Sequence, residues 1–188
     1  YSGGPGTEAQ RFEVAVGAVL TQNTSWLNAE RAIMNLVAGE CLSPAGILGL
    51  GRERLASLIR PSGYFNQKAE RLLLLADFFS GGERPTREAL LAIRGVGPET
   101  ADSIMLYAYS FPVFVVDAYT RRIFARIGET RPEDGYEQVR ERFESRLPRD
   151  PALFQEYHAL IVELAKRHCL KRPHCDGCPI ARHCDKMI

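Results

Sequence analysis

The sequence lacks a long hydrophobic run, a secretory signal and a strong net charge. None of its apolar stretches approaches the roughly 18 residues that a membrane-spanning helix needs, and the first segment, YSGGPGTEAQRFEV, has no basic region followed by an apolar one. The net charge is +1, which by itself points neither towards nor away from nucleic acid. With 188 residues, of which 45% are hydrophobic, the chain can bury a core, so we expect a folded cytoplasmic protein with no membrane partner.

Lysine is scarce. The chain contains four: Lys68, Lys166, Lys171 and Lys186. The whole span from residue 69 to residue 165 has none. A lysine amine is the side chain that typically forms a Schiff base with a carbonyl carbon. The absence therefore excludes that chemistry from any site built by the middle of the chain.

Positive charge is concentrated at the end of the chain. Residues 166–188 hold six Lys or Arg and two acidic residues, a local charge of +4, whereas the rest of the chain has 18 basic and 21 acidic residues. A basic segment of this kind can bind a polyanion such as DNA, and we expect Lys171 and Arg172 to contact it. The alternative is a solvated surface without a partner.

Five cysteines are present, and four of them lie within sixteen residues: Cys169, Cys175, Cys178 and Cys184. Four thiolates this close in sequence can enclose one zinc ion or one 4Fe-4S cluster. Zinc ribbons commonly pair two Cys-x2-Cys knuckles, so the single Cys-x2-Cys in this segment favours the iron–sulfur cluster. Zinc, with help from the histidines beside the cysteines, stays an alternative. In either case we expect the metal to fold the tail and to present its basic side chains.

Apolar residues recur mostly at helical spacing, which predicts an all-α protein. The expected helices are residues 12–20, 27–37, 54–59, 66–79, 87–93, 98–109, 118–126, 136–146 and a last one that starts near residue 151. The last helix has the clearest apolar stripe: Leu153, Tyr157, Leu160, Ile161 and Leu164. Beside this stripe, His158 is expected to be a half-buried packing residue.

Two segments between the helices call for different interpretations. Ser43-Pro44 is expected to break the chain between two helices. The segment FPVFVVDAY, residues 111–119, is rich in β-branched residues but has no partner strand, so we interpret it as a buried connector that leads into a helix.

The stretch AIRGVGPET predicts a tight turn between two helices. Gly95 suits the left-handed position that ends one helix, and Pro98 suits the first turn of the next. Gly95, Val96 and Gly97 could bring backbone N–H groups close to a DNA phosphate. A dinucleotide-binding loop is the rival interpretation, but the third glycine of that motif is missing and a helix precedes the turn. Tight helix packing without a ligand is the other alternative.

About twenty residues further on, the apolar connector ends at Asp117. A carboxylate at this place can be tuned for catalysis by its buried surroundings. An aspartate at a helix start is also a common N-cap, and both interpretations stay open on the sequence alone.

Taken together, five segments carry a family resemblance: GAVLTQNTSW, IRPSGYFNQKAERL, IRGVGPETADSI, VFVVDAYTRRIFARIG and the cysteine loop. From about Phe12 to Cys184 the chain resembles the endonuclease III branch of the helix-hairpin-helix (HhH-GPD) DNA glycosylases. Several phrases, TQNT and RPSG followed by NQKA among them, look especially like the bacterial 3-methyladenine DNA glycosylases of that superfamily.

The resemblance implies a two-lobed, all-α base-excision-repair enzyme of bacterial or archaeal origin. The first lobe, residues 4–111, would hold six helices and end with the helix-hairpin-helix. The second would combine residues 1–3 with residues 112–188 and carry the 4Fe-4S loop, residues 169–184. Such an enzyme acts as a monomer associated with the nucleoid, binds double-stranded DNA with a damaged or mismatched base, flips that base out and cuts its N-glycosidic bond.

The resemblance also assigns roles to single residues. Asp117 matches the superfamily aspartate, which supports the developing charge on the sugar or positions the nucleophile. Gln22 and Tyr64 match residues that fill the gap left by the flipped base and wedge the opposite strand. The family's cysteine spacing is x6, x2, x5, and the first gap in this sequence is one residue shorter, a change that a loop can absorb.

Glu99 marks the main departure. Members of the family that also cut the DNA strand have a lysine two residues after the second hairpin glycine, and this sequence has Glu99 there. Because a carboxylate cannot form an imine, we predict a monofunctional glycosylase without AP lyase activity. Asp117 would be its essential carboxylate, and Glu99 would assist the water or shape the pocket.

The substrate favoured by the shared phrases is an alkylated purine such as 3-methyladenine. A cationic base suits an aromatic stacking site, and Trp26, Tyr64 and Phe65 could form one. The 3-methyladenine branch, however, has a tryptophan-rich segment upstream and a lysine directly after the aspartate, where this sequence has YSGGPG and Ala118. Uracil, mismatched thymine and oxidised pyrimidines are therefore alternatives. So are a non-catalytic DNA-binding iron–sulfur protein and a zinc-stabilised interaction module.

Overall fold

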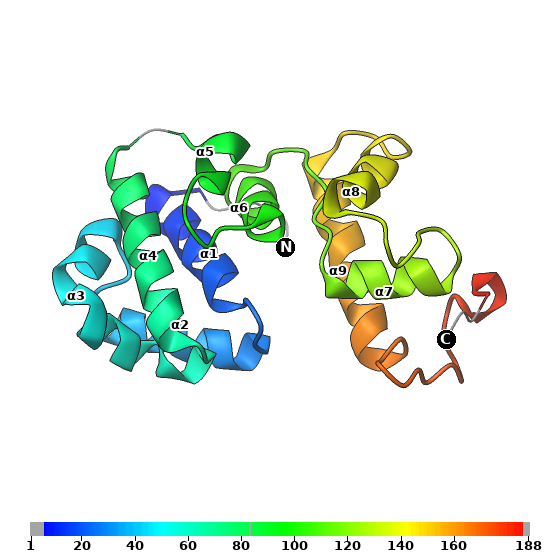
Figure 1. Cartoon of the computed structure of the whole chain (residues 1–188), viewed down its shortest axis with the longest axis horizontal. Coiled ribbons are helices and arrows are strands. Elements are labelled where there is room, and N and C mark those ends of the chain that lie inside the picture. Colours follow the sequence, from blue (N-terminus) through cyan, green and yellow to red (C-terminus); the bar gives the residue numbers. More distant parts are fainter. Residues whose placement is uncertain (1–5, 83, 186–188) are drawn as a thin grey trace. The chain divides into compact units, whose positions relative to one another are not determined.

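Every regular element in the described residues, 6–82 and 84–185, is a helix in this computed structural model. The prediction of an all-α protein is therefore confirmed. The helices fall into two units, of which the first ends at Ser110 and the second begins at Phe111 (Figure 1). The expectation that residues 1–3 join the second lobe lies outside the described residues. Within the described part of the chain, no helix is both long and apolar enough to span a membrane.

The first unit is built around one central helix, α1. Its elements are α1 (Glu8–Leu20), α2 (Trp26–Ala38), α3 (Pro44–Leu58), the short 3-10 turn η1 (Arg60–Ser62), α4 (Phe65–Ser80), α5 (Arg87–Leu91) and α6 (Pro98–Tyr109). Helix α1 packs against α2, α4 and α6. Its residues Ala15, Val16, Val19 and Leu20 are completely buried, which makes α1 the core of this unit.

Ser43-Pro44 separates α2 from α3, as predicted, but α3 begins ten residues before the start that we expected. The Ser43 hydroxyl caps the helix by accepting the backbone N–H of Gly46 at 3.0 Å, and Pro44 occupies the first helical position, where its missing N–H costs nothing. The helix is interrupted at Gly51, whose φ of 70° kinks it. The Ser-Pro pair is a helix start in this chain.

The second unit contains α7 (Ala118–Arg126), α8 (Tyr136–Glu144), α9 (Pro151–Arg167) and the short η2 (Ala181–His183). Its core is aromatic. The Phe114 ring stacks on Phe143 with 4.1 Å between centroids and meets Phe154 edge-on at 5.5 Å. Aromatic pairs in these arrangements stabilise a core beyond the burial of their area.

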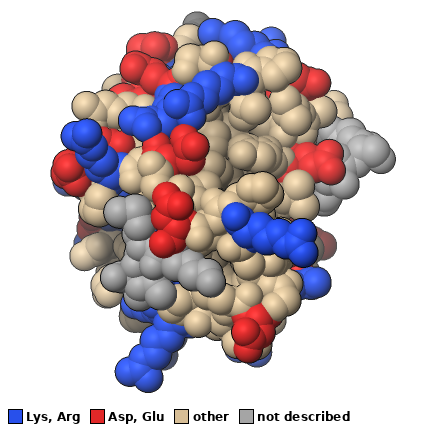
Figure 2. All heavy atoms as spheres, turned by 90° about the vertical axis from the view of Figure 1, so that its right-hand side faces the viewer, with Lys and Arg blue, Asp and Glu red and all other residues tan. Residues whose placement is uncertain are grey.

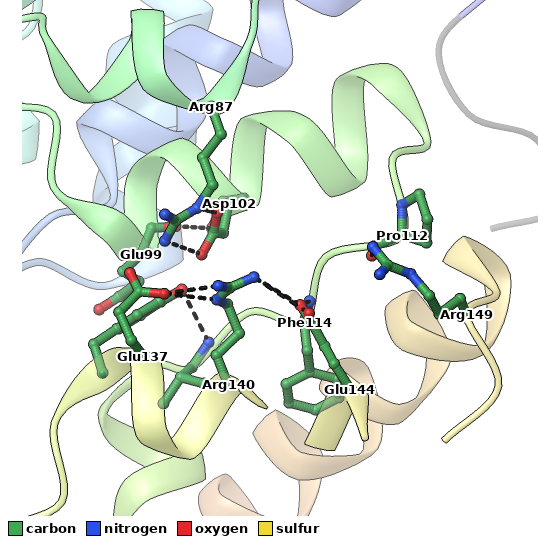
Figure 3. A network of polar contacts seen from close by, with 12 residues as sticks. Arg87, Glu99, Asp102, Pro112, Phe114, Glu137, Arg140, Glu144 and Arg149 are labelled. Carbon is green, nitrogen blue, oxygen red and sulfur yellow. Dashed lines mark hydrogen bonds and ion pairs between the residues drawn. The ribbon is translucent and has the colours of Figure 1, made fainter. Parts of the chain in front are cut away.

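The segment before α7 is a buried connector, as predicted. Val113, Phe114, Val115 and Val116 are buried, yet they form no regular element. The Phe114 N–H donates to Glu144 Oε1 at 2.9 Å, and Arg140 holds the same carboxylate at 3.1 Å (Figure 3). A side chain of α8 thus satisfies a buried backbone group that a sheet would otherwise satisfy.

The apolar stripe predicted for α9 is partly wrong. Leu160 is 59% exposed, and the residues that are buried are Phe154, Ile161 and Ala165. The inward face passes through His158, which is half-buried as expected. The rotation of the helix brings this histidine against Asp117, a contact that the sequence did not reveal.

Candidate active site

The turn between α5 and α6 has the expected hairpin geometry. Gly95 adopts a φ of 90°, a conformation that favours glycine, and a Cβ there would collide with the side chain of Arg71. Gly97 is the N-cap of α6 and Pro98 is its first residue. Val96 differs from its neighbours, since its side chain is buried and its N–H donates to Ile93 O at 3.0 Å. The turn can therefore present the exposed backbone of Gly95 and Gly97, while Val96 anchors it.

Gln22 lies directly against this hairpin. Its Nε2 donates to Thr100 Oγ1 at 2.8 Å and to Gly95 O at 3.2 Å. Its Oε1 accepts from Arg71 Nη1. The structure thus joins Gln22 to the turn and to the first turn of α6, although the two segments are far apart in sequence.

Tyr64 projects from the surface just before α4. It adopts the left-handed conformation with φ 47° and is 65% exposed. A non-glycine residue in this region is uncommon and marks a constrained loop. Trp26, at the start of α2, is 57% exposed, and Phe65 is half-buried next to Arg60. Two of the three predicted stacking aromatics therefore offer their rings to solvent.

A hollow of about 240 Å³ lies beside the hairpin in the first unit. Its lining consists of Gln67, Glu70, Arg71, Leu74, Arg94 and Gly95. None of the three predicted stacking aromatics belongs to this lining, so the hollow does not correspond to the expected base pocket.

Asp117 caps α7 and keeps one oxygen outside the cap. Its Oδ1 accepts the N–H of Thr120 at 2.7 Å and the hydroxyl of the same residue at 2.8 Å. Its Oδ2 lies 3.6 Å from His158 Nε2. Burial raises the pKa of the carboxyl, but the histidine and the two Thr120 donors outweigh it and lower the pKa below its ordinary value. The N-cap interpretation and a chemically active carboxylate are therefore compatible.

Glu99 sits exposed in the first turn of α6, where an acidic side chain interacts favourably with the helix dipole. Its backbone carbonyl accepts the hydroxyl of Ser103 at 2.7 Å. Glu99 belongs to the first unit and Asp117 to the second.

A buried ion pair joins α6 to α5. Asp102 is completely buried, and Arg87 holds both of its oxygens, with Nε to Oδ1 at 2.6 Å and Nη2 to Oδ2 at 3.1 Å (Figure 3). Such a bidentate pair fixes orientation as well as charge. It joins α5 to α6 on either side of the hairpin and so supports the turn.

Sequence reasoning missed Lys68. It is 1% exposed, and its Nζ donates to Leu20 O at 2.8 Å and to Ser62 O at 2.7 Å. Burial, and to a smaller extent the nearby Arg71, lower the pKa of Lys68 to about 8. The available signal was its position, because Lys68 stands in the apolar stripe of α4, four residues before Leu72.

The four cysteines of the tail line one hollow. Ile123 of α7 and Ile127, the residue that follows this helix, are among the apolar side chains that also line it. Arg126 braces the loop, since its Nη1 donates to Cys169 Sγ at 3.2 Å and to Leu170 O at 2.6 Å, and its Nη2 donates to Lys171 O at 2.9 Å. Within residues 6–82 and 84–185, however, no three Cys, His or acidic groups converge closely enough to hold a metal ion. The thiols share a hollow without meeting at a single point.

Lys171 and Arg172 are both exposed, as expected for polyanion contacts. On the face drawn in Figure 2, Lys and Arg side chains alternate with Asp and Glu. The coloured part of that face therefore presents no uniform basic surface.

The helical fold and the hairpin define a class before any close relative is considered. A solved structure of a non-covalent endonuclease III–DNA complex superimposes with a TM-score of 0.84, covering 94% of this chain and 83% of that one at 23% identity. The protein thus has the endonuclease III fold. Residues 16–149, which include the hairpin and Asp117, match the model of the HhH-GPD superfamily of base excision DNA repair proteins. The chain belongs to this family.

Individual relatives cover nearly the whole chain. A Methanocaldococcus jannaschii protein named "Putative DNA repair glycosylase MJ1434" is 46% identical over 93% of this chain and 85% of its own length. Endonuclease III of Thermotoga maritima is 30% identical over 95% of this chain and 84% of its own. The solved H. pylori 3-methyladenine DNA glycosylase bound to 1,N6-ethenoadenine has a TM-score of 0.73 and 30% identity over 83% of this chain and 85% of that one.

Proposed function

We propose that the protein is a monofunctional DNA glycosylase, which hydrolyses the N-glycosidic bond of a damaged base with water and leaves the abasic strand uncut. Base excision repair of DNA is the work of its family. The observation that carries the proposal is the Asp117 carboxylate, which is largely buried, has a lowered pKa and keeps Oδ2 outside the helix cap. The lack of lysine between residues 69 and 165 supports hydrolysis over Schiff-base chemistry.

The proposed reaction uses Asp117 as an anion. Positive charge develops on the sugar as the glycosidic bond lengthens, and a preorganised carboxylate stabilises that charge. Thr120 fixes Oδ1 by two hydrogen bonds, so Oδ2 is the oxygen that would face the sugar or the water. Glu99 would either assist the attacking water or shape the pocket.

The remaining residues would hold the DNA. A monomer would bind one duplex, with phosphates against the backbone of Gly95 and Gly97 and against the side chains of Lys171 and Arg172. Gln22 and Tyr64 would support the gap left by the extruded base. Opening a base pair costs a few kcal/mol, so side chains that occupy the gap lower that cost.

We further propose an alkylated purine, with 3-methyladenine as the model lesion, as the substrate. Two observations support this choice: the 30% identity to the H. pylori 3-methyladenine enzyme and the exposed rings of Trp26 and Tyr64. An aromatic face attracts a cationic base. The 30% identity to an endonuclease III keeps uracil, mismatched thymine and oxidised pyrimidines as the second set of substrates.

A panel of duplexes, each with one defined lesion, tests this function. We expect release of 3-methyladenine or 1,N6-ethenoadenine to be at least about tenfold faster than release of uracil, mismatched thymine or thymine glycol, because a pocket discriminates by its contacts to the base. Strand cleavage by the protein is scored before alkali is added. Base release is scored after alkali, which cuts the DNA at every abasic site. Release of pyrimidines alone would replace the substrate assignment, and no release from any duplex would favour a non-catalytic DNA-binding protein.

The four cysteines are proposed to hold a 4Fe-4S cluster. The donor set fits, because Cys169, Cys175, Cys178 and Cys184 line one hollow and a cluster holds its ligands further apart than a single ion does. When bound, the cluster would order the tail, since metal–thiolate bonds supply folding free energy. Zinc is the alternative occupant.

Metal analysis distinguishes the two. Protein purified without oxygen is expected to be brown and to contain iron and acid-labile sulfide in equal amounts. A colourless preparation with one zinc per chain would contradict the cluster. As a matched control, Cys41→Ser changes the one cysteine outside the loop, and the iron content should not change.

A further inference from the structure

Lys68 is a buried cation with no carboxylate partner in the described residues. It lies within α4, and its Nζ is enclosed by the protein. Burial of an ammonium group is costly unless hydrogen bonds replace the lost water. The replacements are two backbone carbonyls, those of Leu20 and Ser62, at 2.8 and 2.7 Å. The two hydrogen bonds of Lys68 therefore fix the positions of the Leu20 and Ser62 carbonyls relative to α4.

The two carbonyls occupy equivalent positions. Leu20 is the last residue of α1, and Ser62 is the last residue of η1. Carbonyl oxygens at the C-terminal end of a helix receive no hydrogen bond from an N–H within the helix, and they attract a cation. Gln22 follows Leu20 by two residues, and Tyr64 follows Ser62 by two residues. One ammonium group thus pins the starts of both loops that carry the proposed gap-filling side chains.

Helix α4 continues this support one turn later. Arg71, on the same helix, donates to the Gln22 side chain, which in turn donates to Gly95 and Thr100. Lys68 therefore holds the backbone of the two loops, and Arg71 holds the Gln22 amide against the hairpin.

We propose that Lys68 is a positioning residue that sets the spacing of the Gln22 and Tyr64 loops, so that both side chains can occupy an opened base pair. This inference rests on the proposed function. It concerns recognition of the gap and not the bond-breaking step. Loss of Lys68 should therefore weaken binding to opened DNA specifically, because contacts to intact duplex run through the hairpin and the tail.

Lys68→Met tests the proposal, since methionine is also long and unbranched but cannot donate the two hydrogen bonds of Nζ. Binding is measured by fluorescence anisotropy at one salt concentration, with a duplex that carries a tetrahydrofuran abasic-site analogue and with an intact duplex. We expect the affinity for the analogue to fall about tenfold and the affinity for intact DNA to stay within about twofold. Leu75→Ala, a completely buried change on the same helix, is the control for general destabilisation and should keep the wild-type ratio.

A wild-type ratio of the two affinities in folded Lys68→Met would overturn the proposal. If that variant does not fold, Lys68→Gln replaces it. Its amide is uncharged and shorter than the lysine side chain, so it should hold the two carbonyls less closely. A partial loss of the ratio is therefore expected, and an unchanged ratio would again overturn the proposal. The wild-type protein separates this failure from failure of the proposed function. A wild type without preference for the analogue refutes gap recognition itself, whereas a preference retained by the variant refutes only the role of Lys68.

Discussion

Asp117→Asn is expected to slow base release by about a thousandfold or more, as removal of an electrostatic group at a developing charge does. The fold should persist with a small loss of stability, because the negative charge beside His158 is removed. Asparagine caps a helix about as well as aspartate, so the contact to the Thr120 N–H persists while the negative charge is lost. Single-turnover excision from the best duplex of the panel gives the rate, and thermal unfolding gives the stability.

The same substitution at another helix start provides the control for this experiment. Asp150 caps α9 in the same unit, with its Oδ1 accepting the N–H of Ala152 at 2.8 Å. Asp150→Asn should leave excision unchanged. Equal rates for wild type and Asp117→Asn would remove the carboxylate from the mechanism.

The pKa of Asp117 adds a pH dependence to this comparison. Because His158 and Thr120 hold the folded-state pKa of Asp117 below its ordinary value, the carboxylate stabilises the fold above that ordinary value, and its contribution is lost as the pH falls through the folded pKa. Acid unfolding of Asp117→Asn should therefore depend less steeply on pH than that of the wild type in this range.

Borohydride trapping is expected to give no covalent complex between the wild-type protein and lesion-containing DNA. Trapping requires an imine between an amine and the C1′ carbon, and no lysine is present from residue 69 to residue 165. Lys68 is the lysine nearest to the hairpin in sequence. Its Nζ is buried and donates hydrogen bonds to two backbone carbonyls. The abasic strand should correspondingly stay intact until alkali is added.

Gel electrophoresis of the reduced reaction measures the outcome, with a bifunctional glycosylase run beside it to show that the reduction works. A slower-migrating protein–DNA band above a few per cent of the input would show that another amine attacks the sugar. Mass spectrometry of the trapped peptide would then identify that amine.

Local features of the fold could be predicted from the sequence. The hairpin is an example, because the conformation of Gly95 and the helix start at Pro98 follow from the residues themselves. The connector before Asp117 was predictable as well, since an apolar segment without a partner strand has to be buried by helices. The start of α3 was missed because Ser-Pro occurs both in turns and at helix starts, and the sequence alone did not decide between them.

Contacts between distant residues could not be predicted. The bond from Lys68 to Leu20 joins residues 48 positions apart, and the approach of His158 to Asp117 depends on how α9 rotates against α7. The exposure of Leu160 shows the same effect, because several faces of α9 are apolar and only packing against the aromatic core selects one. Helical periodicity predicts that a face is buried, whereas the neighbouring helices determine which face it is.

The two oxygens of Asp117 make different contacts, and this difference has an evolutionary consequence. Oδ1 caps the helix and Oδ2 lies against His158. In the proposed mechanism, an asparagine at this position would therefore remove the reaction and keep the helix cap. Aspartate and asparagine codons differ by one nucleotide. A lineage could therefore convert such an enzyme into a folded protein that binds DNA without repairing it in a single mutational step, and purifying selection at Asp117 would report on catalysis rather than on folding.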